Sequence, residues 1–409
     1  MSISERDAPL PQPFIKLAWA NLFAQAAEQL SLAACPIIAV LMLAAGPGEI
    51  GLLASAQTLP FLLFSIPLGL LADRVSRQKI MVASECIRTL ALLGLMACVA
   101  LDKVSMSLLA ILGFIGAVGT VGFSVAAPAL VPNLVPRDAL GRANGKLELA
   151  RSTAFAAGPA VAGAIVAWVG ATPTFSVAAV LSSAAVLILL RVHDRQERAM
   201  VKRNVLADLK QGMRFIWSQE FLRPILYTSI AWNIAWFVLQ AAYIPYAIRV
   251  LGLSSSEVGA TMACYGIGMI TGALLAPKII KRIPFGTAIL VGPWFSVAAS
   301  AVMLTTLFVP SGWLAGFSYF LFGAGPILWT ITSTTLRQTV TPNDLLGRVG
   351  SMMLTVNFGI RPLGAALGAF IGSQWGEATC LAVSLAAFLV QSLVITFSAV
   401  RGLKALPQT

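Results

Sequence analysis

Long apolar runs alternate with short polar connectors along the whole chain of 409 residues. Each run is long enough for the roughly 20 apolar residues that a membrane-spanning helix needs. The twelve runs begin near Phe14, Ile50, Lys79, Val104, Gly145, Ala171, Leu222, Glu257, Phe285, Gly312, Leu346 and Ala378. The pattern predicts an all-α integral membrane protein with twelve transmembrane helices, six on each side of a longer polar connector.

That connector divides the chain into residues 1–192, a linker of residues 193–221, and residues 222–409. Within the linker, apolar residues recur with the spacing of one helix face. They are Val205, Leu206, Leu209, Met213, Ile216 and Trp217. We expect an amphipathic helix there, lying at the inner headgroup level and joining two six-helix bundles.

A short polar turn occurs at corresponding positions of the two halves. PRDALGRANG, from Pro136 to Gly145, returns 206 positions later as PNDLLGRVGS, from Pro342 to Ser351. Both copies separate two apolar runs, as expected for parallel repeats in a transporter. The two bundles are therefore predicted to be related by a pseudo-two-fold axis along the membrane normal.

The composition excludes an ordinary soluble domain. Hydrophobic residues make up 58% of the chain and charged residues only 11%, whereas soluble domains carry about 25% charged residues. The net charge is +12, and the distribution of the basic residues follows the positive-inside rule. With a cytoplasmic N-terminus, Lys103 and Arg249 are the only basic residues predicted on the outer side. We expect a multi-pass protein of a bacterial-type inner (plasma) membrane with both termini cytoplasmic, in contact with lipid and needing no nucleic-acid partner.

Between the second and third runs lies GLLADRVSRQK, from Gly69 to Lys79. It resembles the G-x-L-a-D-R-x-x-R-[KR] signature of the major facilitator superfamily. Gly69 permits close helix approach, and the Asp73 carboxylate suits the positive N-terminus of a neighbouring helix. The resemblance implies the major facilitator fold and a cytoplasmic latch between the bundles, formed by Gly69, Asp73, Arg74 and Arg77.

The fifth run carries small residues at spacings similar to the G-x8-G-x3-G-P-x2-G-G motif of proton-coupled exporters. They are Gly145, Ala154, Gly158, Pro159, Ala162 and Gly163, with alanine at two glycine positions. Small residues on one helix face permit tight contact between helices, so the packing and the antiporter interpretations share one physical basis.

The repeated turns, with the residues before them, resemble the drug:proton antiporter branch that includes the enterobactin exporter and macrolide efflux proteins. That branch exports siderophores, antibiotics and other amphipathic molecules, and it also includes a lysophospholipid transporter. The resemblance implies fold and transport class and leaves the substrate open.

Charged and amide side chains inside the bilayer are candidates for transport, because an ionisable group there is costly. In the first run Asn21, Gln25 and Glu28 share a helix face, and Glu28 lies roughly 21 Å beyond the start of the run, near mid-membrane. Asn233 and Gln240 repeat the seven-residue spacing in the seventh run. The two first helices are therefore predicted to line a central cavity.

Two interpretations of Glu28 stay open. It can be a carboxylate that loads and releases a proton, or it can form a permanent ion pair with Arg361, the one cation deep in the eleventh run. Trp236 and Tyr243 share the face of Asn233 and Gln240, so we expect them to contact substrate. Tyr319 of the tenth run either lines the same cavity or, because it lies near a helix end, belongs to an interfacial belt.

Two further acid–base pairs lie three residues apart and can each meet on one helix face. Glu85 with Arg88 and Glu148 with Arg151 are interpreted mainly as structural or gating ion pairs near the cytoplasmic end, with proton coupling as the alternative.

These observations predict a secondary active transporter that works by alternating access, most simply a monomeric, proton-coupled exporter of an amphipathic drug, antibiotic or siderophore. A proton-coupled importer or a lysophospholipid flippase is the alternative on the same fold. An enzyme is not predicted: the single His193 lies in the linker, the runs hold no paired carboxylates, and no G-x-x-x-x-G-K-[ST] loop occurs. No cofactor or metal is expected. A membrane sensor that transports nothing is left open.

Overall fold

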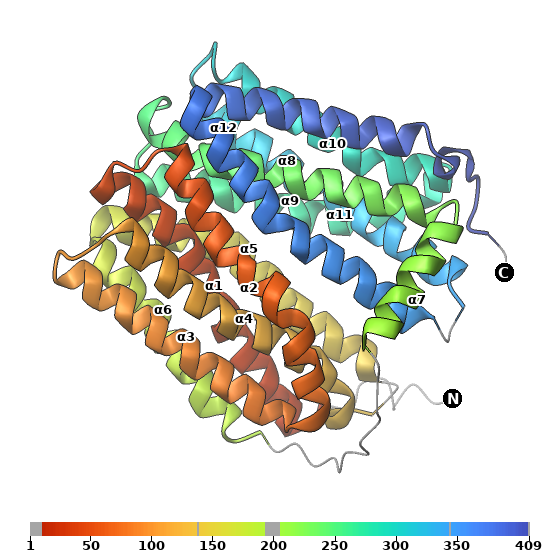
Figure 1. Cartoon of the computed structure of the whole chain (residues 1–409), viewed down its shortest axis with the longest axis horizontal. Helices are drawn as coiled ribbons and strands as arrows, with labels where there is room; N and C mark the ends of the chain where they lie inside the picture. Colours follow the sequence, from red (N-terminus) through yellow and green to blue (C-terminus); the bar gives the residue numbers. More distant parts are fainter. Residues whose placement is uncertain (1–9, 137–138, 193–204, 343–344, 408–409) are drawn as a thin grey trace.

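The computed structural model describes residues 10–136, 139–192, 205–342 and 345–407, and these residues form helices and turns without strands (Figure 1). The N-terminal bundle contains α1 (Gln12–Leu43), α2 (Pro47–Arg74), α3 (Arg77–Ala100), α4 (Met106–Leu134), α5 (Leu140–Trp168) and α6 (Ala171–Leu189). The linker helix is α7 (Val205–Ser218). The C-terminal bundle contains α8 (Leu222–Arg249), α9 (Ser255–Arg282), α10 (Phe285–Thr305), α11 (Gly312–Val340) and α12 (Leu346–Thr396), followed by the short 3-10 helix η3 (Ala399–Gly402).

The last helix, α12, contains two predicted spans. It is 51 residues long and bends at Gly376, whose φ of 78° lies in the left-handed region that glycine adopts without strain. Figure 1 shows α12 turning back on itself at this point. The eleventh and twelfth spans are thus joined by a kink, and the predicted fold of two six-helix bundles is confirmed.

Local sequence explains where two of the helices begin. Ser105 and Ser311 accept hydrogen bonds from the backbone amides at the starts of α4 and α11, which satisfies donors that a helix start leaves unpaired.

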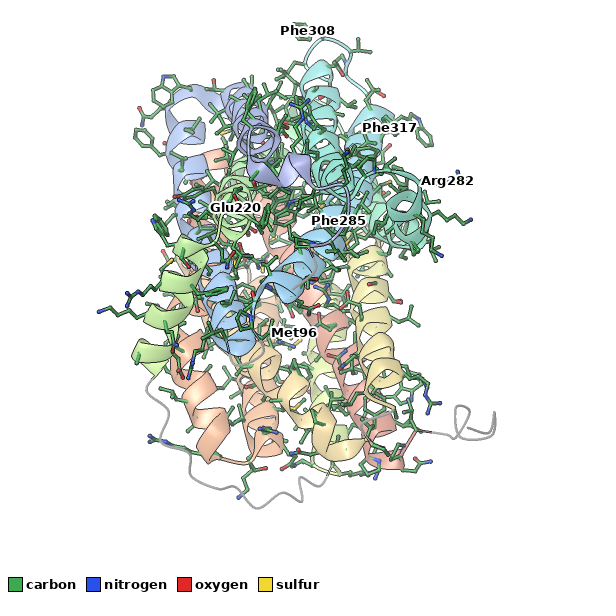
Figure 2. All side chains as sticks on the ribbon, turned by 90° about the vertical axis from the view of Figure 1, so that its right-hand side faces the viewer. Met96, Glu220, Arg282, Phe285, Phe308 and Phe317 are labelled. Atoms are coloured by element: carbon green, nitrogen blue, oxygen red, sulfur yellow. The ribbon has the colours of Figure 1, made fainter. Side chains whose placement is uncertain are left out.

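Phe308 and Phe317 project from the periphery of the C-terminal bundle (Figure 2). Outward-facing apolar side chains of this kind suit a protein surrounded by lipid.

The linker helix α7 packs on the C-terminal bundle. The Arg348 Nε atom donates to Asp208 Oδ1 at 2.7 Å, which ties α7 to the first turn of α12. A Cβ atom at Gly212 would lie 2.5 Å from the Arg348 carbonyl oxygen, so glycine permits the close approach. His193 and the rest of the linker up to residue 204 lie outside the described residues.

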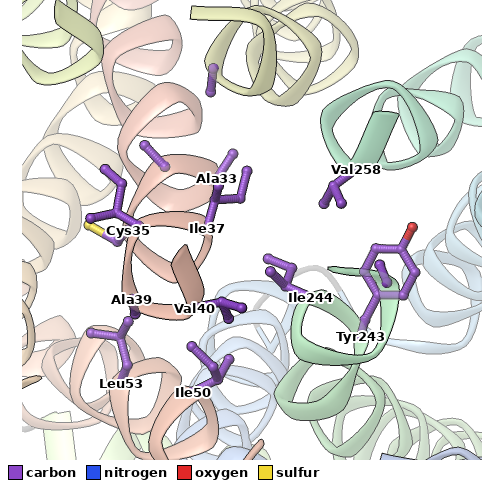
Figure 3. Close-up of a cluster of buried hydrophobic side chains, with 14 of the residues drawn as sticks. Ala33, Cys35, Ile37, Ala39, Val40, Ile50, Leu53, Tyr243, Ile244 and Val258 are labelled. Carbon is purple, nitrogen blue, oxygen red and sulfur yellow. The ribbon is translucent and has the colours of Figure 1, made fainter. Parts of the chain in front are cut away.

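We call the face where α1 begins and α12 ends the terminal face, and the opposite face the distal face. The bundles meet tightly at the distal face. A Cβ atom at Gly51 of α2 would lie 2.6 Å from the Ala369 backbone nitrogen, and one at Gly163 of α5 would lie 2.3 Å from the Ser255 carbonyl oxygen. Val40 and Ile50 of one bundle lie across from Ile244 of the other in the same buried cluster (Figure 3).

Side chains of α5 and α9 are more exposed near the terminal face than near the distal face. Leu149 of α5 is 66% exposed and Leu274 of α9 is 72% exposed, although α5 and α9 are in backbone contact farther along. A Cβ atom at Gly145 or Gly350 would meet nothing within 4 Å. The bundles are therefore closed at the distal face and separate toward the terminal face.

Candidate functional site

A cavity of about 510 Å³ lies between the two bundles. The lining side chains come from α1 to α5 of the N-terminal bundle and from α8, α9, α11 and α12 of the C-terminal bundle. Its size suits a drug-sized ligand, and a cavity at the interface of two bundles is where such ligands bind in transporters.

Four charged side chains line this cavity: Glu28, Arg88, Arg151 and Arg361. The Glu28 carboxylate of α1 lies 3.9 Å from the Arg88 guanidinium of α3, and the Glu28 side chain is 17% exposed. Arg151 pairs with Glu148 at 2.7 Å on the same helix. The prediction that the first helix of each half lines a central cavity agrees with the positions of Gln25, Glu28, Asn233, Trp236 and Gln240 on the cavity wall.

Arg88 is held by more partners than Glu28 alone. Its guanidinium lies 2.7 Å from Glu85 and donates to the Ala24 carbonyl at 3.0 Å and to the Thr120 hydroxyl at 2.9 Å. The Ser182 hydroxyl donates to the other carboxylate oxygen of Glu85 at 2.8 Å. Glu85 and Arg88 thus form a buried pair that contacts Glu28 and lies next to the cavity.

Arg361 is placed differently. Its Nε atom donates to the Asn233 side-chain oxygen at 3.3 Å, and its guanidinium lies 4.5 Å from the centre of the Phe358 ring. In the described part of the chain no carboxylate lies within 4 Å of it, so the ion pair between Arg361 and Glu28 that was left open above is not formed here. The amide and the ring hold the guanidinium of a residue that lines the cavity.

Aromatic rings form one wall. The Trp236 ring lies 5.4 Å from the Trp232 ring, stacked on it, and 5.3 Å from the Tyr265 ring. Tyr319 donates a hydrogen bond to Gln240 Oε1 at 2.8 Å. Rings at these distances provide a large apolar surface with a few polar groups at its edge.

Two residues lie elsewhere than expected, and a third occupies one of its two expected places. Tyr243 is fully buried and bonded to the Thr261 hydroxyl, away from the cavity. Asn21 is buried where α1 meets α5, and its amide donates to the Leu147 carbonyl at 3.4 Å. Tyr319, for which the cavity wall and an interfacial belt were the alternatives, is buried and lines the cavity. A shared face on a helix does not determine which neighbour the face meets.

Several polar residues on the cavity wall were not anticipated, and two of them are informative. Gln57 and Tyr265 line the cavity from α2 and α9. A signal for Gln57 existed, because a glutamine within an apolar run is as unusual as Gln25. Tyr265 carried no such signal, since a tyrosine in an apolar run is equally compatible with packing.

The small residues of the antiporter-like motif pack α5 against both bundles. A Cβ atom at Gly158 would lie 2.4 Å from the Gln29 Cβ of α1, while Gly163 faces Ser255 and Gly259 of α9. Ala154 and Ala162 are buried. Gly145, at the start of the motif, has no neighbour within 4 Å of an added Cβ atom. The end of the motif around Gly163 therefore belongs to the contact that closes the distal face.

The segment interpreted as a latch lies at the terminal face, where α2 ends and α3 begins. Arg77 donates to the Ala129 carbonyl of α4, and an added Cβ at Gly69 would approach only Val125, at 4.0 Å. Arg74 is exposed, and the side chain of Asp73 lies outside the described residues. Among the described residues, no three His, Cys, Asp or Glu side chains gather as a metal site.

Comparison with known proteins gives one consistent picture. A family model described as "Transmembrane secretion effector" matches residues 6–409. The multidrug efflux pump Tap of Mycobacterium tuberculosis H37Rv is 25% identical over 411 residues, which cover 97% of this chain and 96% of that protein. The enterobactin exporter EntS of Citrobacter koseri is 23% identical over 328 residues, covering 80% and 77%. The inward-facing crystal structure of a bacterial homologue of the iron transporter ferroportin superposes with a TM-score of 0.75 at 16% identity, covering 97% of this chain and 98% of that one.

Proposed function

Because this chain belongs to the transmembrane secretion effector family of major facilitator superfamily transporters, we propose that it exports an amphipathic small molecule in exchange for protons. That it is a transporter of small molecules and not an enzyme, as the sequence predicts, is confirmed by its relatives. The names of two relatives, a multidrug efflux pump and an enterobactin exporter, favour export.

The terminal face is the cytoplasmic face in this proposal. The basic residues of the chain gather on the connectors of that face, in accord with the positive-inside rule. The cavity then opens toward the cytoplasm while the distal face is closed, which is the state in which an exporter loads its substrate. The latch role of Gly69, Asp73, Arg74 and Arg77 stays a prediction for the opposite state, in which the terminal face would close.

The observation that carries the proton step is the unequal pairing of Arg88. Its contact with Glu85 is 2.7 Å, whereas its contact with Glu28 is 3.9 Å. If Glu28 takes up a proton, Arg88 keeps Glu85, the Ala24 carbonyl and the Thr120 hydroxyl, so no buried cation is left unpaired. Glu28 can therefore change its charge at a lower cost than either member of the closer pair.

Glu28 also faces the space that the substrate would occupy. Its electrostatic surroundings are Arg88 and Glu85 of α3, Arg151 of α5 and Arg361 of α12. A proton or a positively charged group of the substrate can each neutralise Glu28, and both cannot do so at once. Such competition, combined with closure of the bundles around an occupied cavity, links outward movement of substrate to inward movement of protons.

The proposal is tested in vesicles that hold a pH-sensitive dye, with gradients of ethidium and of ciprofloxacin as probes. The wild-type protein should move protons when a probe gradient is imposed. Glu28→Gln should bind the probes and lose at least about 90% of the probe-driven proton flux, because the amide cannot release a proton.

Glu148→Gln is the matched control. It also removes one carboxylate paired with an arginine, but Glu148 does not line the cavity. We expect it to retain proton coupling. Probe transport by the wild type without proton movement, or unchanged coupling in Glu28→Gln, would contradict the proposal.

A further inference from the structure

The two walls of the cavity carry unequal charge. On the N-terminal wall, Glu28 is the single carboxylate among the described lining residues, and its arginine partner is closer to another acid. On the C-terminal wall, Arg361 lines the cavity, and no carboxylate of the described residues lies within 4 Å of its guanidinium. The cavity thus has an incompletely paired negative group on one side and an unpaired positive group on the other.

We infer that the substrate is an aromatic zwitterion, with an acidic group on Arg361 and an amine on Glu28. This inference rests on the proposed function, because it assigns a chemical class to the molecule that the cavity carries. It makes Arg361 a specificity-determining residue.

Arg361 is prepared for an anion by its two fixed contacts. The Asn233 oxygen accepts from Nε, and the Phe358 ring packs at 4.5 Å against the guanidinium, so both contacts hold the side chain without neutralising it. The two terminal nitrogens have no protein acceptor among the described residues. A planar guanidinium presents parallel donors that match the two oxygens of a carboxylate, which favours a planar acid over a point charge.

The charge balance of the cavity favours a molecule with no net charge. Three guanidiniums, Arg88, Arg151 and Arg361, are balanced by Glu85, Glu148 and Glu28. A zwitterion preserves this balance, whereas a simple anion or cation adds one uncompensated charge to a poorly solvated site. The amine on Glu28 also explains how an acidic substrate can still compete with the proton.

The aromatic part of the substrate follows from the aromatic side chains that line the same cavity as the two charges. Stacked Trp232 and Trp236, with Tyr265 beside them, offer flat apolar surface in a cavity of about 510 Å³. A flat ring system can lie on these rings while its two ends reach opposite bundles. Because Glu28 belongs to α1 and Arg361 to α12, such a ligand would tie the bundles together.

The test is equilibrium binding to the purified full chain, measured by dialysis and the fluorescence of the probe. Ciprofloxacin supplies an aromatic zwitterion, its ethyl ester a cation without the acid, and its N-acetyl derivative an anion without the amine. The wild type should bind ciprofloxacin about 10-fold or more tighter than either derivative, as expected for losing one hydrogen-bonded charged group.

Variants assign each end of the probe. Arg361→Gln should weaken ciprofloxacin about 10-fold or more and the ester by at most about two-fold, whereas Arg361→Lys should restore part of the loss. Arg282→Gln is the control, because Arg282 is an exposed arginine in the last turn of α9 that does not line the cavity; it should keep the preference for the acid. Thermal unfolding of each variant verifies that it is folded.

Several results would overturn the inference: no binding of ciprofloxacin, equal binding of all three compounds, equal losses for ciprofloxacin and its ester in Arg361→Gln, or loss of acid preference in Arg282→Gln. Binding is measured without a proton gradient, so the outcome is separate from that of the proposed exchange. Acid selectivity through Arg361 without proton coupling would support the substrate class and refute the antiport.

Discussion

Arg249 at the end of α8 should hold the distal face closed. Its guanidinium donates to the Ala44 carbonyl and, at 2.7 Å, to the Ala45 carbonyl at the end of α1, and it lies 3.8 Å from Glu377 of α12. The two carbonyl contacts join the C-terminal bundle to the N-terminal bundle, whereas Glu377 belongs to the same bundle as Arg249. Arg249→Met keeps the length of the stem and removes every donor.

The magnitude follows from these contacts. A hydrogen bond to a charged group contributes about 1.5–3 kcal/mol when buried, but the Arg249 side chain is 38% exposed, and exposed ion pairs contribute about 1 kcal/mol or less. We therefore estimate about 2 kcal/mol in total, discounted for solvent. If the outward-open state lacks the two carbonyl contacts between the bundles, Arg249→Met should raise the population of that state relative to the state closed at the distal face about 30-fold.

Thiol labelling measures that population. With the five native cysteines replaced, Ser255→Cys places a small thiol where α9 meets α5 at the distal face, in a position that is buried in this state. A membrane-impermeant maleimide added from the outer side should react about 30-fold faster when Arg249→Met is also present.

Lys103→Gln serves as the control, because Lys103 is a cation on the same face in the turn between α3 and α4, within one bundle. It should leave the labelling rate unchanged. A labelling rate with Arg249→Met that lies within about two-fold of the rate with Arg249 retained would refute the estimated 30-fold effect. It would show that apolar packing alone closes the distal face.

Three further predictions concern other contacts. Gly163→Leu should prevent closure of the distal face, because even a Cβ atom would lie 2.3 Å from the Ser255 carbonyl oxygen; the same labelling assay should report a permanently reactive thiol. Asp208→Arg or Arg348→Asp alone should make α7 accessible to protease, and the double exchange should restore protection, since the 2.7 Å ion pair ties α7 to α12. The Glu257 carboxylate accepts hydrogen bonds from the Ser254 amide at 2.8 Å and from the Ser254 hydroxyl at 2.7 Å, so Glu257→Ala should destabilise the start of α9 by about 1 kcal/mol; thermal unfolding should show the loss.

Much of the fold could be predicted because hydropathy in a membrane protein is strongly patterned. The starts of α6, α8, α10, α11 and α12 fall at the predicted residues, and the other spans begin within a few residues of them. The break before the twelfth span was predicted as a boundary near Ala378, and the structure replaces a connector by the bend at Gly376. A single glycine is enough there, because its left-handed φ reverses the chain without a loop.

The site could be predicted only in part. Spacing placed Glu28, Gln25, Asn233 and Gln240 on faces that do line the cavity. The partner of Glu28 was not predictable, because Arg88 lies on α3 and was assigned to a local pair with Glu85. Local spacing identifies pairs within a helix, whereas contacts between helices depend on rotations that an apolar run does not specify.

Tyr243 illustrates the same difficulty. It shares a helix face with Gln240, yet it is buried against Thr261 of α9, and Tyr319 of α11 takes the place beside Gln240. Because α8 is apolar on most sides, its sequence does not reveal which side meets α9 and which meets the cavity.

Accumulation against a gradient tests the central claim most directly. Inside-out vesicles with an acidic interior are supplied with ciprofloxacin at equal concentration on both sides. The account predicts that wild-type protein concentrates the compound inside, that a protonophore abolishes this, and that Glu28→Gln does not concentrate it. Equal concentrations at steady state with the wild type, while the pH gradient persists, would contradict proton-driven export.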